Sequence, residues 1–182
     1  MLTLVVEIIP ESWDEENQEF VPAKTQTLQL EHSLVSIKKW ESKWNRSFLS
    51  SKQGMTDEES LDYIKCMTLT QNVKPYVYEC ITRKNVLEVE QYITAPMTAT
   101  TFNDRDSKRG SSEIITAELI YYWMIACGIP MECQKWHLNQ LITLIRVCSV
   151  KNGPAKKMSK SDIAKQNAAL NAARRQRLNS KG

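Results

Sequence analysis

The features that mark common catalytic and cofactor-binding classes are scarce in this chain of 182 residues. It has five glycines and two histidines, and it contains no GxSxG, no HExxH and no glycine-rich phosphate loop. Its five cysteines are odd in number and include no CxxC pair, which indicates reduced thiols and not a disulfide framework. We therefore predict a noncatalytic protein that uses no cofactor.

Long apolar runs are missing as well. The longest falls far short of the ~20 residues that a membrane-spanning helix needs. The N-terminus, MLTLVVEIIPESWDEE, has no basic leader and turns acidic directly after its apolar run, so it does not have the pattern of a signal peptide. With 42% hydrophobic and 25% charged residues the composition is that of a globular protein, and we expect it to be intracellular.

Positive charge is concentrated at the C-terminus. Residues 151 to 182 hold nine lysines or arginines and one acid, a net charge of +8, whereas the whole chain carries +3, so residues 1 to 150 carry a net charge of −5. The basic side chains with a candidate binding role are Lys156, Lys157, Lys160, Arg174, Arg175 and Arg177. The tail has no aromatic residue on which bases would stack, so docking to a protein partner, or disorder, is favoured over nucleic-acid binding.

The N-terminal residues have the pattern of a β-hairpin. Residues 2 to 9, LTLVVEII, are rich in β-branched side chains, and residues 23 to 33 alternate between polar and apolar side chains. We expect the two to pair as antiparallel strands across a long acidic loop at residues 11 to 19. Because a lone hairpin is marginal in water, it must pack on helices or on another subunit.

Helical patterns dominate the following residues. Ser33 is the expected N-cap of a helix over residues 34 to 48, with Ile37, Trp40, Trp44 and Phe48 on one side. Thr56 and Glu59 form a capping box that begins the next helix. Further predictions, in chain order, are a short helix from Pro75, a helix capped by Asn85, a strand or extended segment at 97–102 and a polar, flexible loop at 103–112.

Two more helices are expected before the tail. The first is capped at Ser112, with Glu113 in its first turn, and ends at Gly128 and Pro130; it is apolar on almost every side from Leu119 to Cys127. The second runs from Met131 to about Val150, with a core stripe of Leu138, Leu141, Ile142, Ile145 and Cys148. The short link at residues 128 to 130 predicts that the two form an antiparallel pair.

A metal site is the alternative interpretation of Cys127 at the end of the first helix together with Cys133, His137 and Cys148 in the second. Their spacing matches no zinc motif, and Cys133 and His137 share a helix face with Leu141, so we expect no metal. His137 is instead expected at a helix surface or interface beside Trp136.

Together these patterns predict an α+β fold that is predominantly α-helical. A mainly helical globular domain occupies residues 1 to 150, and its N-terminal antiparallel β-hairpin, about residues 1 to 32, packs on a helical bundle. Residues 151 to 182 form a basic tail that is helical or disordered, and marginal in isolation because its large apolar anchors are few.

Several segments also resemble a known family. LQLEHSLVSIKKWESKWNRSFL, DYIKCMTLT, MTAT, IITAELIYYWMIACGIPMECQKWHLNQLITLIRVCSVKN and PAKKMSK resemble, in this order, small proteins of bacteriophage tail gene modules described as tail assembly chaperones. The resemblance covers Leu28 to about Arg177. It implies a helical, noncatalytic, oligomeric viral protein of virion assembly that binds the tape measure protein and other tail proteins in the host cell cytoplasm and keeps the tape measure protein soluble.

Two alternatives remain open. One is a structural component of the neck, tail or baseplate that stays in the virion, and the other is a nucleic-acid-binding factor that acts through the basic tail. For a chaperone, exposed apolar side chains would form the contact surface. The candidates are Trp40, Trp44, Tyr121, Tyr122, Trp123, Trp136 and His137.

Overall fold

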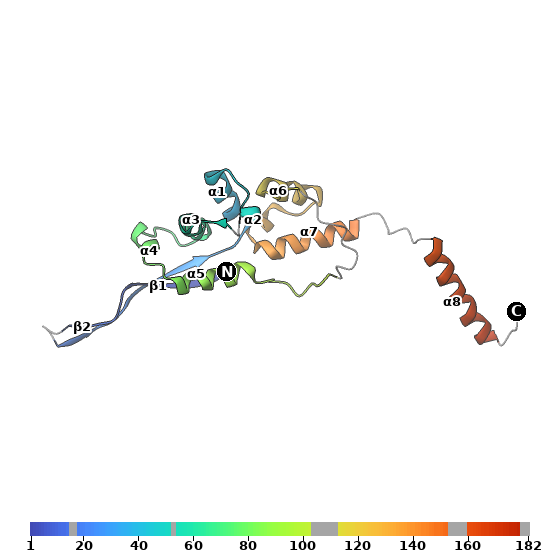
Figure 1. Cartoon of the computed structure of the whole chain (residues 1–182), viewed down its shortest axis with the longest axis horizontal. Helices are drawn as coiled ribbons and strands as arrows, with labels where there is room; N and C mark the ends of the chain where they lie inside the picture. The colour runs from blue at the N-terminus through green and yellow to red at the C-terminus, as the bar shows by residue number, and fades with distance from the viewer. Residues whose placement is uncertain (15–17, 52–53, 103–112, 153–159, 179–182) are drawn as a thin grey trace. The chain divides into compact units, whose positions relative to one another are not determined.

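The computed structural model describes residues 1–14, 18–51, 54–102, 113–152 and 160–178. The chain divides into two compact units, residues 1–150 and residues 151–182. The first unit contains a two-stranded sheet packed with helices, so the fold is α+β and mostly helical, as predicted (Figure 1). Among the described residues the helices are α1 (Leu34–Trp44), α2 (Phe48–Ser51), α3 (Asp57–Met67), α4 (Pro75–Glu79), α5 (Arg83–Thr94), α6 (Ala117–Ala126), the 3-10 helix η3 (Met131–Lys135), α7 (Leu138–Asn152) and α8 (Lys160–Leu178).

The predicted antiparallel pairing at the N-terminus is confirmed. Strand β1 (Leu2–Ile9) pairs with β4 (Lys24–Leu30), in a register that sets Leu4 opposite Leu28. Alternate side chains of both strands, including Leu4 and Leu28, are fully enclosed, while those between them face solvent. One face of the sheet is therefore part of the hydrophobic core.

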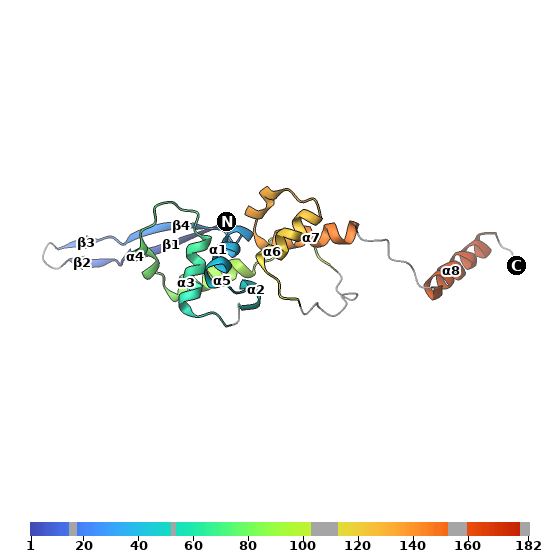
Figure 2. The same cartoon turned by 90° about the horizontal axis from the view of Figure 1, so that it is seen from above.

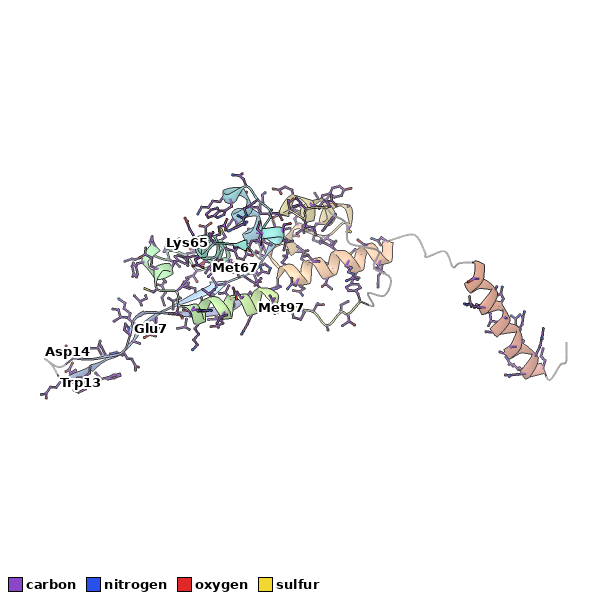
Figure 3. The ribbon with its side chains drawn as sticks, viewed as in Figure 1. Glu7, Trp13, Asp14, Lys65, Met67 and Met97 are labelled. Carbon is purple, nitrogen blue, oxygen red and sulfur yellow. The ribbon has the colours of Figure 1, made fainter. Side chains whose placement is uncertain are left out.

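The prediction of an acidic loop at residues 11 to 19 is wrong in part. Strands β2 (Ser12–Asp14) and β3 (Glu19–Val21) continue the ribbon as a second antiparallel pair, with Trp13 opposite Phe20. Aromatic side chains favour strands and stabilise each other across a ladder, which explains why this acidic sequence is not a simple loop. Figure 3 shows Trp13 and Asp14 at the end of the ribbon, away from the helices.

Both edges of the sheet are partly covered by segments distant in sequence. Beside β4, Leu69 N–H donates to the Gln29 carbonyl at 2.8 Å, and Glu31 N–H donates to the Met67 carbonyl at 3.0 Å. Helix α5 runs beside β1 (Figures 1 and 2), and the Asn85 side chain donates to the Val5 carbonyl at 3.0 Å. These contacts satisfy backbone groups that an isolated hairpin would leave to water.

The predicted helix starts at Ser33 and Thr56 are correct. Both residues cap with their hydroxyls, in capping boxes completed by Ser36 and Glu59. Helix α1 ends earlier than expected, because its C-cap Asn45 adopts a left-handed conformation with φ 52°. Phe48 consequently begins α2 and is not part of the α1 stripe.

Some boundaries in the next segment differ from the prediction. Pro75 occupies the first turn of α4 as expected. The N-cap of α5 is Thr82 and not Asn85, which instead completes the capping box from the third helical position. Residues 97 to 102 form no strand, and the predicted flexible loop at 103–112 lies outside the described residues.

The two predicted C-terminal helices of residues 1–150 also need correction. Helix α6 is capped by Thr116, whereas the expected cap Ser112 lies outside the described residues, and Gly128, with φ 66°, follows the end of the helix. The expected continuous helix from Met131 is divided into η3 and α7, with extended backbone at Trp136. Helix α6 packs mainly on α1, which η3 also contacts, so α6 and α7 are not a simple antiparallel pair.

A buried carboxylate joins α1 to two later helices. Glu41 accepts hydrogen bonds from the Phe48 N–H at 2.9 Å and from the Ala117 N–H at 2.7 Å. These are amide groups at the starts of α2 and α6, where a helix leaves its first donors without partners. Glu41 therefore fixes the position of α6 relative to α1, although 76 residues separate Glu41 from Ala117.

Replacing Glu41 tests this connection. We expect Glu41→Ala to lower the free energy of unfolding by about 3 kcal/mol, because two buried amides lose an ionised acceptor. Glu41→Gln keeps one acceptor oxygen, so its free energy of unfolding should lie between those of the original chain and Glu41→Ala. The measurement is urea denaturation, with Glu118→Ala, an exposed acid in the first turn of α6, as the control that changes stability by less than about 1 kcal/mol. Equal effects of Glu41→Ala and Glu118→Ala would contradict the role of Glu41.

Candidate functional site

The tryptophan pair proposed as a contact surface lies largely in the core. Trp40 is fully enclosed and its indole N–H donates to the Glu59 carbonyl at 3.0 Å. Trp44 is half-buried and donates to Oδ2 of Asp62, also at 3.0 Å. The rings do face each other, with centroids 6.2 Å apart, but they join α1 to α3. Trp40 is therefore not available to a partner in this structure, which corrects the sequence prediction.

Ion pairs support the same helix contact. Lys43 pairs with Asp62, and Arg46 donates to Oε1 of Glu59 at 2.9 Å. Both carboxylates are buried or nearly so, whereas both cations reach them from more exposed positions. The hydrogen bond to Asp62 is the main cause that raises the pKa of Lys43. The polar groups around the tryptophans thus have partners within the fold.

His137 is buried, which corrects its expected position at a helix surface. The extended backbone at Trp136 brings His137 beside Ser33 in an isolated bridge, and the Leu138 N–H donates to the His32 carbonyl at 2.7 Å. Its Nε2 donates to the Tyr92 carbonyl at 3.1 Å, and its Nδ1 accepts from the Asn139 N–H at 3.3 Å. Both ring nitrogens have the partners of a neutral imidazole.

The second histidine is enclosed in the same cluster. The rings of His32 and His137 have centroids 5.1 Å apart, and Nδ1 of His32 shares a 2.5 Å hydrogen bond with the Tyr63 hydroxyl. Tyr92 contacts His137 edge to face and donates to Oε1 of Glu31 at 2.7 Å. We name His32, Tyr63, Tyr92 and His137 the histidine cluster.

Burial shifts the pKa values of three members of the histidine cluster, Tyr63, Tyr92 and His137. Burial raises the pKa of Tyr63 far above its usual value, and it raises that of Tyr92 together with the hydrogen bond to Glu31. Burial also lowers the pKa of His137, against the smaller opposite effects of the Tyr92 carbonyl and Glu31. Both histidines are almost inaccessible to solvent, so the cluster has the properties of a structural junction and not of an open catalytic site.

The cysteines do not add a metal centre to this cluster. All five are free thiols, with Cys133 buried and the others half-buried. Within the described part of the chain, no group of three or more histidine, cysteine, aspartate or glutamate side chains has an arrangement that could hold a metal ion.

Of the predicted partner-binding aromatic residues on α6 and η3, some are exposed. Tyr121 and Trp123 are half-buried, and the Tyr121 hydroxyl donates to the Gln134 side chain at 2.8 Å. Tyr122 is 64% exposed and Ile125, one turn further along α6, is 69% exposed. We name Tyr122 and Ile125 the α6 face. Trp136 is also exposed, in the segment after η3.

The predicted basic residues of the tail are only partly described. Lys156 and Lys157 lie outside the described residues, as does the side chain of Lys160. Arg174, Arg175 and Arg177 are all exposed on α8. The described side chains of α8 are exposed throughout its length, so this helix buries none of them.

Two exposed aromatic residues were not predicted as candidates. Trp13 is 60% exposed and Phe20 is 59% exposed, and they face each other at the end of the hairpin. The sequence carries a signal that could have identified them, because each aromatic residue lies next to acids within a short segment. An aromatic side chain in such a polar segment is difficult to assign to a core.

A small cavity of about 220 Å³ lies between α3 and α5. Its wall is mostly apolar and includes Tyr63, Ile64, Val89 and Ile93. Tyr63 lines this cavity and is also a member of the histidine cluster.

The described residues include no helix that is both long enough and apolar enough to cross a membrane. The chain matches no protein-family model, no curated protein and no solved structure.

The histidine cluster predicts a dependence of stability on pH. Because burial lowers the pKa of His137, the unfolded chain binds the proton more tightly, so protonation favours unfolding. The stabilisation that comes from neutral His137 is complete at neutral pH. The free energy of unfolding should fall as the pH drops below 6.5, the ordinary pKa of histidine. Urea denaturation between about pH 7 and about pH 5 measures it.

The matched variant is His137→Gln, which keeps a side-chain donor for the Tyr92 carbonyl but does not titrate in this range. We expect it to be less stable at neutral pH and to lose less stability on acidification than the original chain. An unchanged pH dependence in His137→Gln would show that other groups cause the acid sensitivity.

Proposed function

We propose that this chain is a noncatalytic chaperone of phage tail assembly, which binds the tape measure protein and keeps it soluble in the host cell cytoplasm while the tail is built. The observation that carries the proposal is the α6 face, where Tyr122 and Ile125 are exposed one turn apart. Large apolar side chains at this spacing on a helix are suited to the apolar stripe of a helical client.

Two further observations support this role. The sequence segments that resemble tail assembly chaperones include all of α6, η3 and α7, so the resemblance contains the α6 face. Both histidines are enclosed, which leaves no solvent-accessible imidazole for acid–base chemistry. A binding protein needs neither a metal nor an activated nucleophile, and its contacts would be apolar and reversible.

Co-expression with the tape measure protein of the same phage tests the proposal. The chain should keep the client in the soluble fraction and be captured with it. We expect Tyr122→Ser combined with Ile125→Ser to weaken capture by more than about tenfold, because each buried apolar side chain contributes about 1.5–3 kcal/mol.

The matched control combines Val5→Thr with Leu87→Gln, which changes two exposed apolar side chains on β1 and α5. This control should retain the client. Equal capture by the α6 variant would exclude the α6 face as the contact, and failure of the original chain to bind any tail protein would refute the proposed function.

The composition of purified virions tests the role separately. A chaperone leaves before the particle is complete, so we expect quantitative mass spectrometry to find far fewer copies of this chain than of the tail proteins. Stoichiometric amounts in the particle would favour the alternative of a structural subunit of the neck, tail or baseplate.

A further inference from the structure

The end of the N-terminal ribbon lies apart from the core. We name residues 9–14 and 18–22 the arm. All of its side chains are exposed except that of Asp14, which is half-buried, and β2 and β3 have their extensive contacts with each other. Figure 3 shows Glu7 where the ribbon leaves the helices and Trp13 at its far end.

The arm exposes more apolar surface than a free ribbon favours. Trp13 and Phe20 are directly opposite in the ladder, so both rings lie on one face, and Ile9 and Val21 are exposed nearby in the sequence. A two-stranded ribbon is marginal in water without a partner for such a face. Exposed aromatic pairs of this kind are typical of interaction surfaces.

The charge around these rings has one sign. Residues 7 to 21 contain six acids and no lysine, arginine or histidine. Glu7, Glu11 and Glu19 are exposed, and the last two lie within two positions of an aromatic residue. The expected occupant is therefore a basic segment with some apolar surface, whereas a second acidic arm would be repelled.

Helix α8 has this chemistry. Arg174, Arg175 and Arg177 are exposed in its last two turns, next to the exposed Leu178. A solitary helix of 19 residues is marginal unless one face packs on something. Guanidinium groups stack on aromatic faces and pair with carboxylates, so these arginines can contact both kinds of side chain in the arm.

We propose that the arm of one copy of this chain binds α8 of a second copy. The arginines of α8 lie over the Trp13 and Phe20 rings and beside Glu11 and Glu19, and Leu178 contacts the apolar side chains of the arm. This contact requires only the chain itself and is independent of the client proposed above.

The α8 that binds the arm is expected to come from a second copy and not from the same chain. Within residues 1–150, the arm and the C-terminal end of α7 lie at opposite ends in both views (Figures 1 and 2). Seven residues separate α7 from α8, and they can span at most ~25 Å. An arm-to-tail contact joins different surfaces of the two copies, so it adds copies head to tail into chains or rings.

Two full-length variants test the contact. The arm variant carries Trp13→Thr and Phe20→Thr, which keep strand propensity, and the tail variant carries Arg174→Gln, Arg175→Gln and Arg177→Gln, which keep helix propensity. The controls are Val5→Thr with Leu87→Gln for the arm, and Lys39→Gln, Lys74→Gln and Lys84→Gln for the tail. The tail control removes the same charge from exposed sites.

Sedimentation velocity after nuclease treatment and a high-salt wash measures the association. The original chain and both controls should self-associate, with a mass that rises with concentration and falls between about 50 mM and about 500 mM salt. For each variant alone, the dissociation constant of self-association should be at least about tenfold higher than that of the original chain. An equimolar mixture should form a 1:1 pair that grows no further, because the tail variant supplies the one intact arm and the arm variant the one intact tail.

Three results would overturn the proposal. These results are a monomeric original chain at low salt, association of both variants to the same extent as the original chain, and no pair in the mixture although circular dichroism shows both variants folded. Capture of the client by the arm variant separates self-association from client binding, because this variant lacks the arm contact but keeps the α6 face.

Discussion

Burial of one face of a two-stranded sheet is the constraint on which residues 1–150 depend. Two strands alone enclose too little apolar surface to persist in water, and Leu4 and Leu28 become inaccessible only within a cluster that also includes residues of the helices. The edge of β4 is completed by residues 67–70, and the carbonyl of His32 is satisfied by Leu138. Strands and helices are therefore mutually dependent, and we expect them to form cooperatively.

The polar groups nearest the core serve this packing. Glu41 satisfies the first amides of α2 and α6, and the histidine cluster joins the end of β4 to the start of α7. Buried polar groups without partners cost free energy, so such connections restrict how the helices can pack. The side chains that look chemically active in the sequence are thus engaged in the fold, and those left for binding lie at the surface.

Among the described residues, the arm, the α6 face and α8 are surfaces outside this packing. Each exposes apolar or charged side chains that the described fold does not bury, and the arm and α8 are marginal as isolated elements. The acidic arm and the basic helix complement each other in charge, whereas the α6 face is mainly apolar. The proposed self-association would use the first kind of surface and the proposed client binding the second.

The sequence by itself determined the local structure: the alternation in β1, the caps at Ser33 and Thr56, and the proline at the start of α4, because each depends on neighbours within a few positions. Periodicity did not distinguish Trp40, which is enclosed, from Tyr122, which is exposed, since both belong to apolar helical segments. Helix α6, which carries Tyr122, packs on α1 where the Ala117 N–H donates to Glu41, and the interruption before α7 accompanies the pairing of His137 with Ser33. Only the tertiary structure decided these features, because they arise from contacts between residues about 75 to 105 positions apart, whose energies no local pattern records.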